Sequence, residues 1–159
     1  MVIKAGDRLP SVEFKTMTAE GPRPMTTEDI FKGRKVVLFG VPGAFTPTCS
    51  AKHLPGFLAH AEAFKAKGVA TIACVSVNDV YVMAAWGKDQ NAGDKILMLA
   101  DGNGDFARAL GLEVDFKAYG MGTRVKRFSL LADNGVVTAL NVDEAGFKET
   151  SAERLLEQI

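Results

Sequence analysis

One cysteine stands where a turn of the backbone could convert its thiol into a nucleophile. Cys49 follows a stretch rich in proline and glycine, residues 41–48 (VPGAFTPT), and precedes an approximate helical period at residues 51–67. The pKa of a free cysteine, near ~8.5, falls by roughly one to five units at a helix N-terminus or beside a cation. The thiolate formed in this way is the species that attacks an electrophile. The position of Cys49 therefore predicts a nucleophilic thiolate.

The flanking elements predict how Cys49 is held. Residues 35–41 (KVVLFGV) form a short apolar run rich in β-branched residues and bounded by Gly and Pro, which is typical of a buried strand. Cys49 then lies at a strand-to-helix turn, where free backbone N–H groups and the helix dipole favour an anion. Pro55 and Gly56 interrupt the helical run early, so we expect a first turn around Cys49 and a break near Pro55.

The residues around Cys49 resemble the active-site signature of a known family, the peroxiredoxins. The pattern Pro42-x-x-x-Thr46-x-x-Cys49, continued by residues 53–57 (HLPGF), is similar to the type II, or type-five-like, subgroup. Further matches follow in order at residues 75–79 (VSVND), 86–87 (WG) and 124–129 (RVKRFS). The resemblance covers nearly the whole chain. It implies a thiol-dependent peroxidase that reduces hydrogen peroxide and small organic hydroperoxides through a Cys49 sulfenic acid.

Reduction of a peroxide by a thiolate has requirements that this chain can meet. The thiolate attacks one oxygen in line and the other oxygen leaves with negative charge, so the site needs cationic or N–H donors and a hydroxyl to orient the peroxide. Thr46 can supply the hydroxyl, although its residue type also suits a helix N-cap. Pro42 can rigidify the loop and shield the sulfur. By resemblance the fixed charge is Arg127, whose guanidinium stays protonated, and Arg124 is a second candidate.

His53 lies four residues after Cys49 and would share a helix face with it. A Cys–His catalytic pair needs an orienting third group that the sequence does not show, and a metal site needs more ligands than two cysteines and two histidines offer without a tight cluster. We therefore expect no metal and no other cofactor. For His53 we expect a local hydrogen bond or a place near a subunit interface, with direct tuning of Cys49 as the alternative. His60 is expected on a helix surface.

Cys74 decides between two catalytic cycles. It lies within residues 69–77 (VATIACVSV), an apolar β-branched run that predicts a buried central strand and an inert thiol. The alternative is a resolving cysteine that condenses with the Cys49 sulfenic acid, for which the two Cα atoms must approach within about 7 Å. Some family members carry a resolving cysteine near the C-terminus, but residues 149–152 (ETSA) hold none. The sequence favours a one-cysteine cycle, in which glutaredoxin with glutathione, or thioredoxin, supplies the reducing thiol.

Composition fits a single domain over residues 1–159. Hydrophobic residues make up 47% of the chain, and 19 basic and 19 acidic residues give zero formal net charge, so nothing favours nucleic acid or an anionic membrane as a partner. No apolar stretch approaches the ~20 residues that span a bilayer. Residues 1–7 resemble neither a signal peptide nor a transit segment. Two cysteines, one of them in a core strand, fit a reducing compartment, and we expect a cytoplasmic location.

The remaining patterns predict alternating strands and helices. Strands are expected at residues 11–15, 35–41, 69–77, 96–100, 125–132 and 136–142, and helices at residues 26–31, 51–67, 79–90, 104–110 and 152–158. The segment 133–135 (DNG) is a strong hairpin signal between the last two strands. This order predicts a thioredoxin-like α/β fold, a central mixed β-sheet flanked by helices.

Such a fold does not by itself define an activity. A dithiol reductase needs a C-x-x-C motif, whereas position 46 is Thr. Two alternatives to the peroxidase stay open: a peroxide sensor or redox relay that uses the same cysteine, and a non-catalytic holdase or binding module. The resemblance also implies a homodimer packed near the active-site loops. A candidate apolar rim or interface for it comprises Phe45, Trp86, Tyr119 and Met121.

Overall fold

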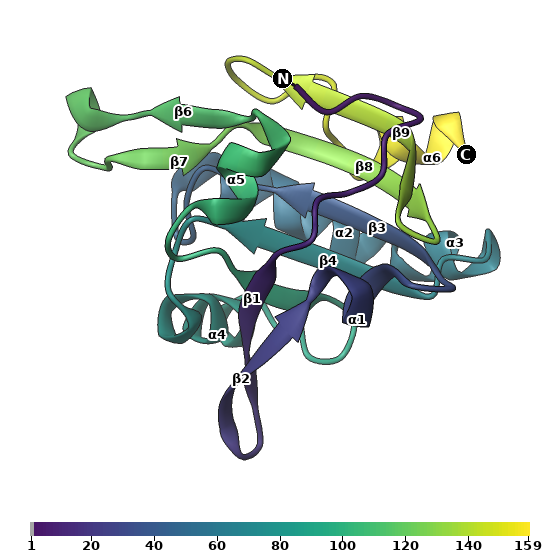
Figure 1. The fold of residues 1–159 in the computed structure, drawn as a ribbon, viewed down its shortest axis with the longest axis horizontal. Helices are drawn as coiled ribbons and strands as arrows, with labels where there is room; N and C mark the ends of the chain where they lie inside the picture. Colours follow the sequence, from purple (N-terminus) through teal and green to yellow (C-terminus); the bar gives the residue numbers. More distant parts are fainter. Residues whose placement is uncertain (1) are drawn as a thin grey trace.

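A seven-stranded mixed sheet forms the centre of the computed structural model, which describes residues 2–159 (Figure 1). Its strands are β1 (Glu13–Thr18), β2 (Gly21–Thr26), β3 (Lys35–Gly40), β4 (Thr71–Ser76), β5 (Leu97–Ala100), β8 (Arg127–Asp133) and β9 (Val136–Asp143). Their order in the sheet is β2-β1-β5-β4-β3-β8-β9. The central strands β3, β4 and β5 are parallel, and the outer pairs are antiparallel. The mixed sheet predicted from the sequence is therefore present.

Helices cover both faces of this sheet, and each face has its own core. The helices are α1 (Thr27–Phe31), α2 (Leu54–Ala59), α3 (Ala61–Ala66), α4 (Val80–Asp89), α5 (Asp105–Leu110) and α6 (Ala152–Gln158). Alternation along β3 divides the cores, because Phe39 packs with α2, α3, α4 and α6, whereas Leu38 packs with α1 and α5. Figure 1 shows α5 in front of the sheet and α2 behind it. Among residues 2–159, no helix has the length and apolar character needed to cross a membrane.

Local sequence signals account for several of these boundaries. Thr26 and Asp29 form a reciprocal capping box at the start of α1, with side chain to backbone distances of 3.1 and 2.9 Å. The Asp79 carboxylate accepts the backbone N–H of Val82 at 2.8 Å and so caps α4. Asn134 adopts a left-handed φ of 51° in the turn between β8 and β9. The predicted helix starts and the predicted hairpin are confirmed at these points.

The first hairpin and a small second sheet were not expected from the sequence. The strand expected at residues 11–15 begins at Glu13 and continues to Thr18, and β2 pairs with it. Pro22 and Pro24 concealed β2, because proline lacks a ladder donor, but β2 is an edge strand and tolerates it. The second sheet joins β6 (Glu113–Asp115) and β7 (Thr123–Val125), with the 3-10 helix η2 (Lys117–Tyr119) between them. Strands of three residues are too short to show an alternating pattern.

The helical run after Cys49 is irregular in two places. After α-helical residues 47–48 it passes through a π-helix, η1 (Cys49–His53), and returns to an α-helix at Leu54. Pro55 lies in the first turn of α2, where its missing N–H is tolerated, so the break expected near Pro55 takes the form of this change of helix type. A second break, which the sequence did not reveal, falls at His60, with φ −102° and ψ 11°, between α2 and α3.

Gly40 at the end of β3 leaves no space for a side chain. A Cβ at this position would lie 2.1 Å from Cε1 of Phe128, a fully buried ring on the paired strand β8. We expect Gly40→Ala to lower the free energy of unfolding by about 1–3 kcal/mol, because the ring must move within a packed core. Urea denaturation measures this loss. Gly56→Ala in α2 is the matched control, because the nearest neighbour of its Cβ outside that helix would be a carboxylate oxygen of Glu153, 3.6 Å away. Equal losses in both variants would contradict the packing argument.

Candidate active site

Cys49 lies where the loop that follows β3 enters η1. The loop is tied to the end of β4, because Val41 N donates to Val75 O at 3.1 Å and the Ser76 hydroxyl donates to Val41 O at 3.0 Å. Further along, Ala44 N donates to the side-chain oxygen of Asn78 at 3.0 Å. The backbone that carries Cys49 is therefore fixed by the parallel centre of the sheet.

The guanidinium of Arg127 meets the sulfur of Cys49. Arg127 begins β8, the strand beside β3, and its Nη2 donates to Cys49 Sγ at 3.3 Å. Both side chains are buried. Because a guanidinium stays protonated, this donor brings a fixed positive charge to the sulfur. The structure thus brings together the predicted nucleophile and the predicted cation, which are 78 residues apart in sequence. Arg127 is buried, whereas an arginine on an exposed strand face would be solvated.

Pro42 and Thr46 belong to the loop that precedes Cys49, and Arg124 of β7 donates to this loop from outside it. The Thr46 hydroxyl donates to Gly43 O at 2.6 Å, so it braces the loop rather than capping the helix. Arg124 is half-buried and donates to Met121 O at 2.9 Å and to Pro42 O at 3.4 Å. Arg124 therefore holds the loop backbone, whereas Arg127 contacts the sulfur.

His53 contacts Arg127 from the last residue of η1. Its Nδ1 lies 2.9 Å from Arg127 Nη1, and its Nε2 lies 2.9 Å from Thr150 O. A guanidinium nitrogen can only donate, so Nδ1 accepts and the ring proton is on Nε2, which donates to Thr150 O. Burial, reinforced by the positive charge of Arg127, lowers the pKa of His53 to about 3. The imidazole is therefore neutral at physiological pH.

The local hydrogen bond expected for His53 is replaced by two long-range ones. Its partners lie 74 and 97 residues away along the chain, and they supply the orienting groups that the sequence did not show. His60 differs from it: this second histidine lies between α2 and α3, with its Nε2 3.4 Å from Glu153.

Asp143 and Thr150, which sequence reasoning missed, support the far side of His53. Asp143 ends β9 opposite Arg127, and its carboxylate accepts the backbone N–H and hydroxyl of Thr150 at 3.2 and 2.8 Å. Further backbone donors are Lys148 N and Glu149 N, each at 3.0 Å. Burial of Asp143 opposes ionisation, but these donors together hold the pKa of its carboxyl below the usual value. An aspartate at the end of a strand before a glycine-containing loop is the only local signal for such a role.

Cys74 lies in β4 between two neighbouring strands, opposite Phe39 of β3 and Met98 of β5. It is fully buried, in the central strand that the sequence predicts. Burial raises the pKa of the Cys74 thiol well above its usual value, and negative charge at Cys49 adds to this effect. Both cysteines are free thiols. Burial therefore keeps the Cys74 thiol protonated. Cys49 differs from it in accepting a hydrogen bond from the guanidinium of Arg127.

The expected apolar rim is only partly exposed. The side chains of Phe45 and Tyr119 are 52% and 76% exposed, and Met121 is half-buried. Trp86 does not belong to the rim: it is fully buried in α4, and its indole N–H donates to Ser50 Oγ at 2.9 Å. The reason is its position on the apolar face of α4, which turns the ring toward η1. Trp86 thus braces the helix turn that begins at Cys49.

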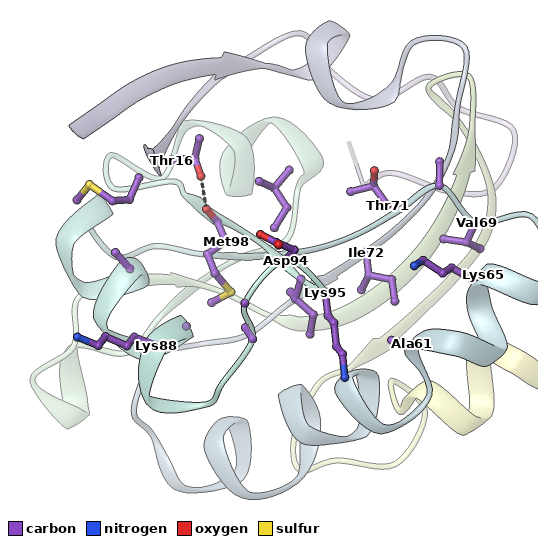
Figure 2. A pocket seen from close by; sticks show the side chains of 18 of the residues that line it. Thr16, Ala61, Lys65, Val69, Thr71, Ile72, Lys88, Asp94, Lys95 and Met98 are labelled. Atoms are coloured by element: carbon purple, nitrogen blue, oxygen red, sulfur yellow. Dashed lines mark hydrogen bonds between the residues drawn. The ribbon is translucent and has the colours of Figure 1, made fainter. Parts of the chain in front are cut away.

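A cavity of about 760 Å³ lies elsewhere, between α3, α4, β4 and β5. Figure 2 shows the side chains that line it, with the Thr16 hydroxyl donating to Met98 O at 2.9 Å. Lys65, Lys88 and Lys95 contribute amino groups, but no predicted site residue lines it. Within residues 2–159, no group of three or more His, Cys, Asp or Glu side chains is placed to hold a metal ion. The predicted site residues Cys49, His53 and Arg127 lie instead in the polar cluster described above.

Known proteins are similar to this chain in both sequence and structure. Residues 4–156 match the Redoxin family. The chain is 44% identical to chloroplastic peroxiredoxin-2E of Arabidopsis thaliana, over 99% of this chain and 69% of that protein. It is 46% identical to peroxiredoxin-2C of Oryza sativa, over 99% of this chain and 98% of that protein. The crystal structure of reduced Prx3 from Vibrio vulnificus in complex with hydrogen peroxide matches with a TM-score of 0.95 and 50% identity, over 99% of each chain.

These matches, together with the mixed sheet flanked by helices, define a redoxin with a thioredoxin-like fold. Within that class the chain belongs to the peroxiredoxins, the family that the residues around Cys49 resemble. It is a thiol-dependent peroxidase, an enzyme that reduces peroxides with electrons from thiols. The family, the fold class and the type of activity predicted from the sequence are confirmed.

The expected cytoplasmic location is wrong by the same comparison. Two of the similar proteins, peroxiredoxin-2E of Arabidopsis thaliana and peroxiredoxin-2E-2 of Oryza sativa, are chloroplastic. The prediction relied on two cysteines and a reducing environment. Free thiols persist in any reducing compartment, so cysteine usage does not separate the cytoplasm from an organelle interior.

Proposed function

We propose that Cys49 is the residue that peroxide oxidises, and that hydrogen peroxide and small organic hydroperoxides are the substrates. The observation that carries this assignment is the 3.3 Å hydrogen bond from Arg127 Nη2 to Cys49 Sγ inside a buried site. A fixed cation bonded to the sulfur favours the nucleophilic thiolate. Among residues 2–159, no cation is hydrogen-bonded to Cys74, and burial raises its pKa. Cys49 is therefore the better nucleophile of the two thiols.

The oxidation step transfers two electrons from sulfur to the peroxide. The Cys49 thiolate attacks one oxygen, an S–O bond forms as the O–O bond breaks, and the second oxygen leaves as hydroxide or alkoxide and takes up a proton. Arg127 can stabilise negative charge as it moves from the sulfur to the leaving oxygen. The Thr46 hydroxyl and backbone N–H groups orient the peroxide, and Pro42 shields the sulfur. Because Cys49 has no exposed surface, small hydroperoxides enter with the least displacement of neighbouring side chains.

The regeneration that we propose uses one cysteine and an external thiol. Cys74 is fully buried in a central strand, where pairing with β3 and β5 on both sides holds its backbone in place. An external thiolate therefore attacks the Cys49 sulfenic acid, forms a mixed disulfide and releases water. A second thiol then displaces Cys49 from that disulfide. Glutaredoxin with glutathione, or thioredoxin, supplies these thiols, and the cycle needs no metal or other cofactor.

A homodimer completes the proposal. Phe45 is exposed on the active-site loop, and Tyr119 is exposed in η2 between β6 and β7. Arg124 of β7 is bonded to that loop through Pro42 O, so the second sheet and the loop are mechanically connected. Exposed aromatic side chains are enriched in protein interfaces. Sedimentation velocity of the full chain and of a Phe45→Asp variant measures whether this surface joins two copies.

Intact-protein mass spectrometry tests the oxidation step. The protein is treated with one equivalent of hydrogen peroxide, without reductant and with dimedone to trap sulfenic acid. We expect one adduct on Cys49 and an unmodified Cys74, no adduct in Cys49→Ser, and an unchanged adduct in Cys74→Ser. Loss of two hydrogens with a Cys49–Cys74 peptide on digestion would overturn the one-cysteine cycle. No change at either thiol within seconds would overturn the assignment of Cys49.

Turnover separates the enzyme from the sensor alternative. With glutathione and glutaredoxin in excess, we expect consumption of many equivalents of hydroperoxide per Cys49. A single equivalent consumed, followed by persistent oxidised protein, would favour the sensor.

A further inference from the structure

The cavity of about 760 Å³ lies where the first hairpin parts from the rest of the large sheet. The pairing of β1 with β5 is limited to Lys15 and Ala100, and from there β1 follows β2 as far as Thr18. Figure 2 shows the Thr16 hydroxyl reaching across to Met98 O, at 2.9 Å. The space beside this contact is enclosed by α3, α4, β4 and β5. Its volume lies within the roughly 300–1,000 Å³ of small-molecule sites.

The wall of this cavity is aliphatic, and among residues 2–159 no aromatic side chain lines it. Val69, Ile72, Ile96 and Met98 supply its larger apolar groups, and Ala84 is one of several small residues on the two helices. A nucleotide base or another aromatic ligand gains affinity by stacking on rings, which this wall does not offer. An unbranched hydrocarbon chain needs only methyl and methylene contacts, to which the flexible thioether of Met98 adapts. The wall therefore favours an aliphatic ligand over an aromatic one.

The charged groups of the wall leave one positive charge in excess. Three are the lysines Lys65, Lys88 and Lys95, and two are the acids Glu62 and Asp94. Across residues 2–159, no carboxylate oxygen lies within 4.0 Å of any of the three amino groups. Figure 2 shows Lys65 and Lys95 extending across the cavity, whereas Lys88 points away from it. One excess charge matches a monoanionic head group, and the two carboxylates would repel a polyanion.

We propose that this cavity is a second ligand site, which binds a single-chain aliphatic monocarboxylate, a fatty acid of medium length. Its chain lies against Ile72 and Met98, and its carboxylate lies between the amino groups of Lys65 and Lys95. Removal of CH₂ groups from water supplies the affinity, and the lysines select the head group. Cys49 takes no part in this site, so the inference goes beyond the function proposed for that residue and does not depend on it.

Monomeric dodecanoate is the probe, and the methionine methyl groups of the wild-type protein locate it. In protein labelled with ¹³C at these methyl groups, Met98 reports on the cavity. Met121 reports on the active-site loop, because its Cε lies 3.3 Å from the position of a Cβ on Gly43. We expect a saturable shift of the Met98 signal, assigned with Met98→Leu, and no shift of the Met121 signal. A shift at Met121 alone, or at neither methionine, would overturn the proposal.

Isothermal titration calorimetry with related amphiphiles tests the chemistry of the ligand. Octanoate has four CH₂ groups fewer than dodecanoate and should bind about 10- to 100-fold more weakly. Dodecyltrimethylammonium has a chain of the same length and the opposite charge, and should bind about tenfold more weakly than dodecanoate. Equal affinity for these two would mean non-specific adsorption and contradict the proposal. Binding to phosphatidylglycerol vesicles without binding of monomeric dodecanoate would indicate a membrane surface, and would also contradict it.

A pair of neighbouring alanines tests whether the chain occupies the cavity. Ala84→Leu fills the space from α4 and should weaken the binding of dodecanoate about tenfold. Ala85→Leu is the matched control, because Ala85 is exposed on the same helix and does not line the cavity. Equal affinity of the two variants for dodecanoate would place the ligand elsewhere.

The lysines are tested by a double variant, Lys65→Met with Lys95→Met. It should weaken dodecanoate about tenfold and remove its advantage over dodecyltrimethylammonium, because the wall then carries no excess positive charge. Lys67→Met is the control, since the Lys67 amino group donates to Ile159 O and does not line the cavity. A double variant that keeps the wild-type preference for dodecanoate would show that these lysines do not recognise the head group, and the proposal would fail.

Discussion

Replacing Arg127 with Gln should slow the oxidation of Cys49 by hydrogen peroxide about 10²- to 10³-fold, the usual cost of one donor aimed at transition-state charge. Arg127 Nη2 is the charged donor on the sulfur, at 3.3 Å, and within residues 2–159 no carboxylate oxygen lies within 4.0 Å of its guanidinium. Arg127→Lys should lose about tenfold, because a single ammonium keeps the charge but cannot bridge Cys49 and His53 as a planar fork does. Both effects should appear in the bimolecular rate.

Stopped-flow fluorescence measures these rates directly. The chain has one tryptophan, Trp86, whose indole N–H donates to the hydroxyl of Ser50, the residue next to Cys49. Arg124→Gln is the control, because the hydrogen bonds of Arg124 go to the backbone oxygens of Met121 and Pro42 and not to the sulfur. We expect this variant to lose clearly less than Arg127→Gln. A larger loss in Arg124→Gln would mean that the cation at the reacting atoms has been assigned to the wrong arginine.

Local patterns sufficed to place Cys49, because each signal lies within a few residues of it. The apolar run before the loop becomes β3, the proline-rich stretch becomes the loop, and the following period becomes the helix. Arg127 could be named only through resemblance to the family. Its contact with the sulfur spans 78 residues and depends on β8 pairing beside β3, and no local pattern contains that information.

His53 shows how a correct spacing can lead to a wrong environment. Four residues separate it from Cys49, which on a regular α-helix predicts a direct neighbour. The segment is a π-helix instead, whose wider turn changes the angle between the two side chains. The two residues meet through the guanidinium of Arg127, and the ring is held by Thr150, 97 residues away. Tertiary contacts of this kind cannot be derived from spacing along one helix.

Acid should destabilise this protein well above the pH at which its carboxylates protonate, because His53 is buried in its neutral form. The pKa of His53 is lowered from 6.5 to about 3 in the folded state, chiefly by burial and then by the charge of Arg127. Between these values the unfolded chain binds a proton that the folded protein does not. The free energy of unfolding therefore falls as pH falls, at up to about 1.4 kcal/mol per pH unit and by roughly 4–5 kcal/mol over the whole window.

Urea denaturation at half-unit steps from pH 7.5 to 4.0 measures this slope. Stability contributed by Asp143, whose pKa is lowered, is lost only below its unfolded value of 3.8. Burial raises the pKa of Asp101, so protonation of that carboxyl opposes the effect of the histidine and cannot produce a loss of stability above pH 3.8. His53→Asn removes the titrating ring and should flatten the slope even where it lowers stability at pH 7. His60→Asn, which removes the surface imidazole beside Glu153, should keep it. A slope that survives in His53→Asn would show that another group takes up the proton, and that the imidazole beside Arg127 is not held neutral by its burial.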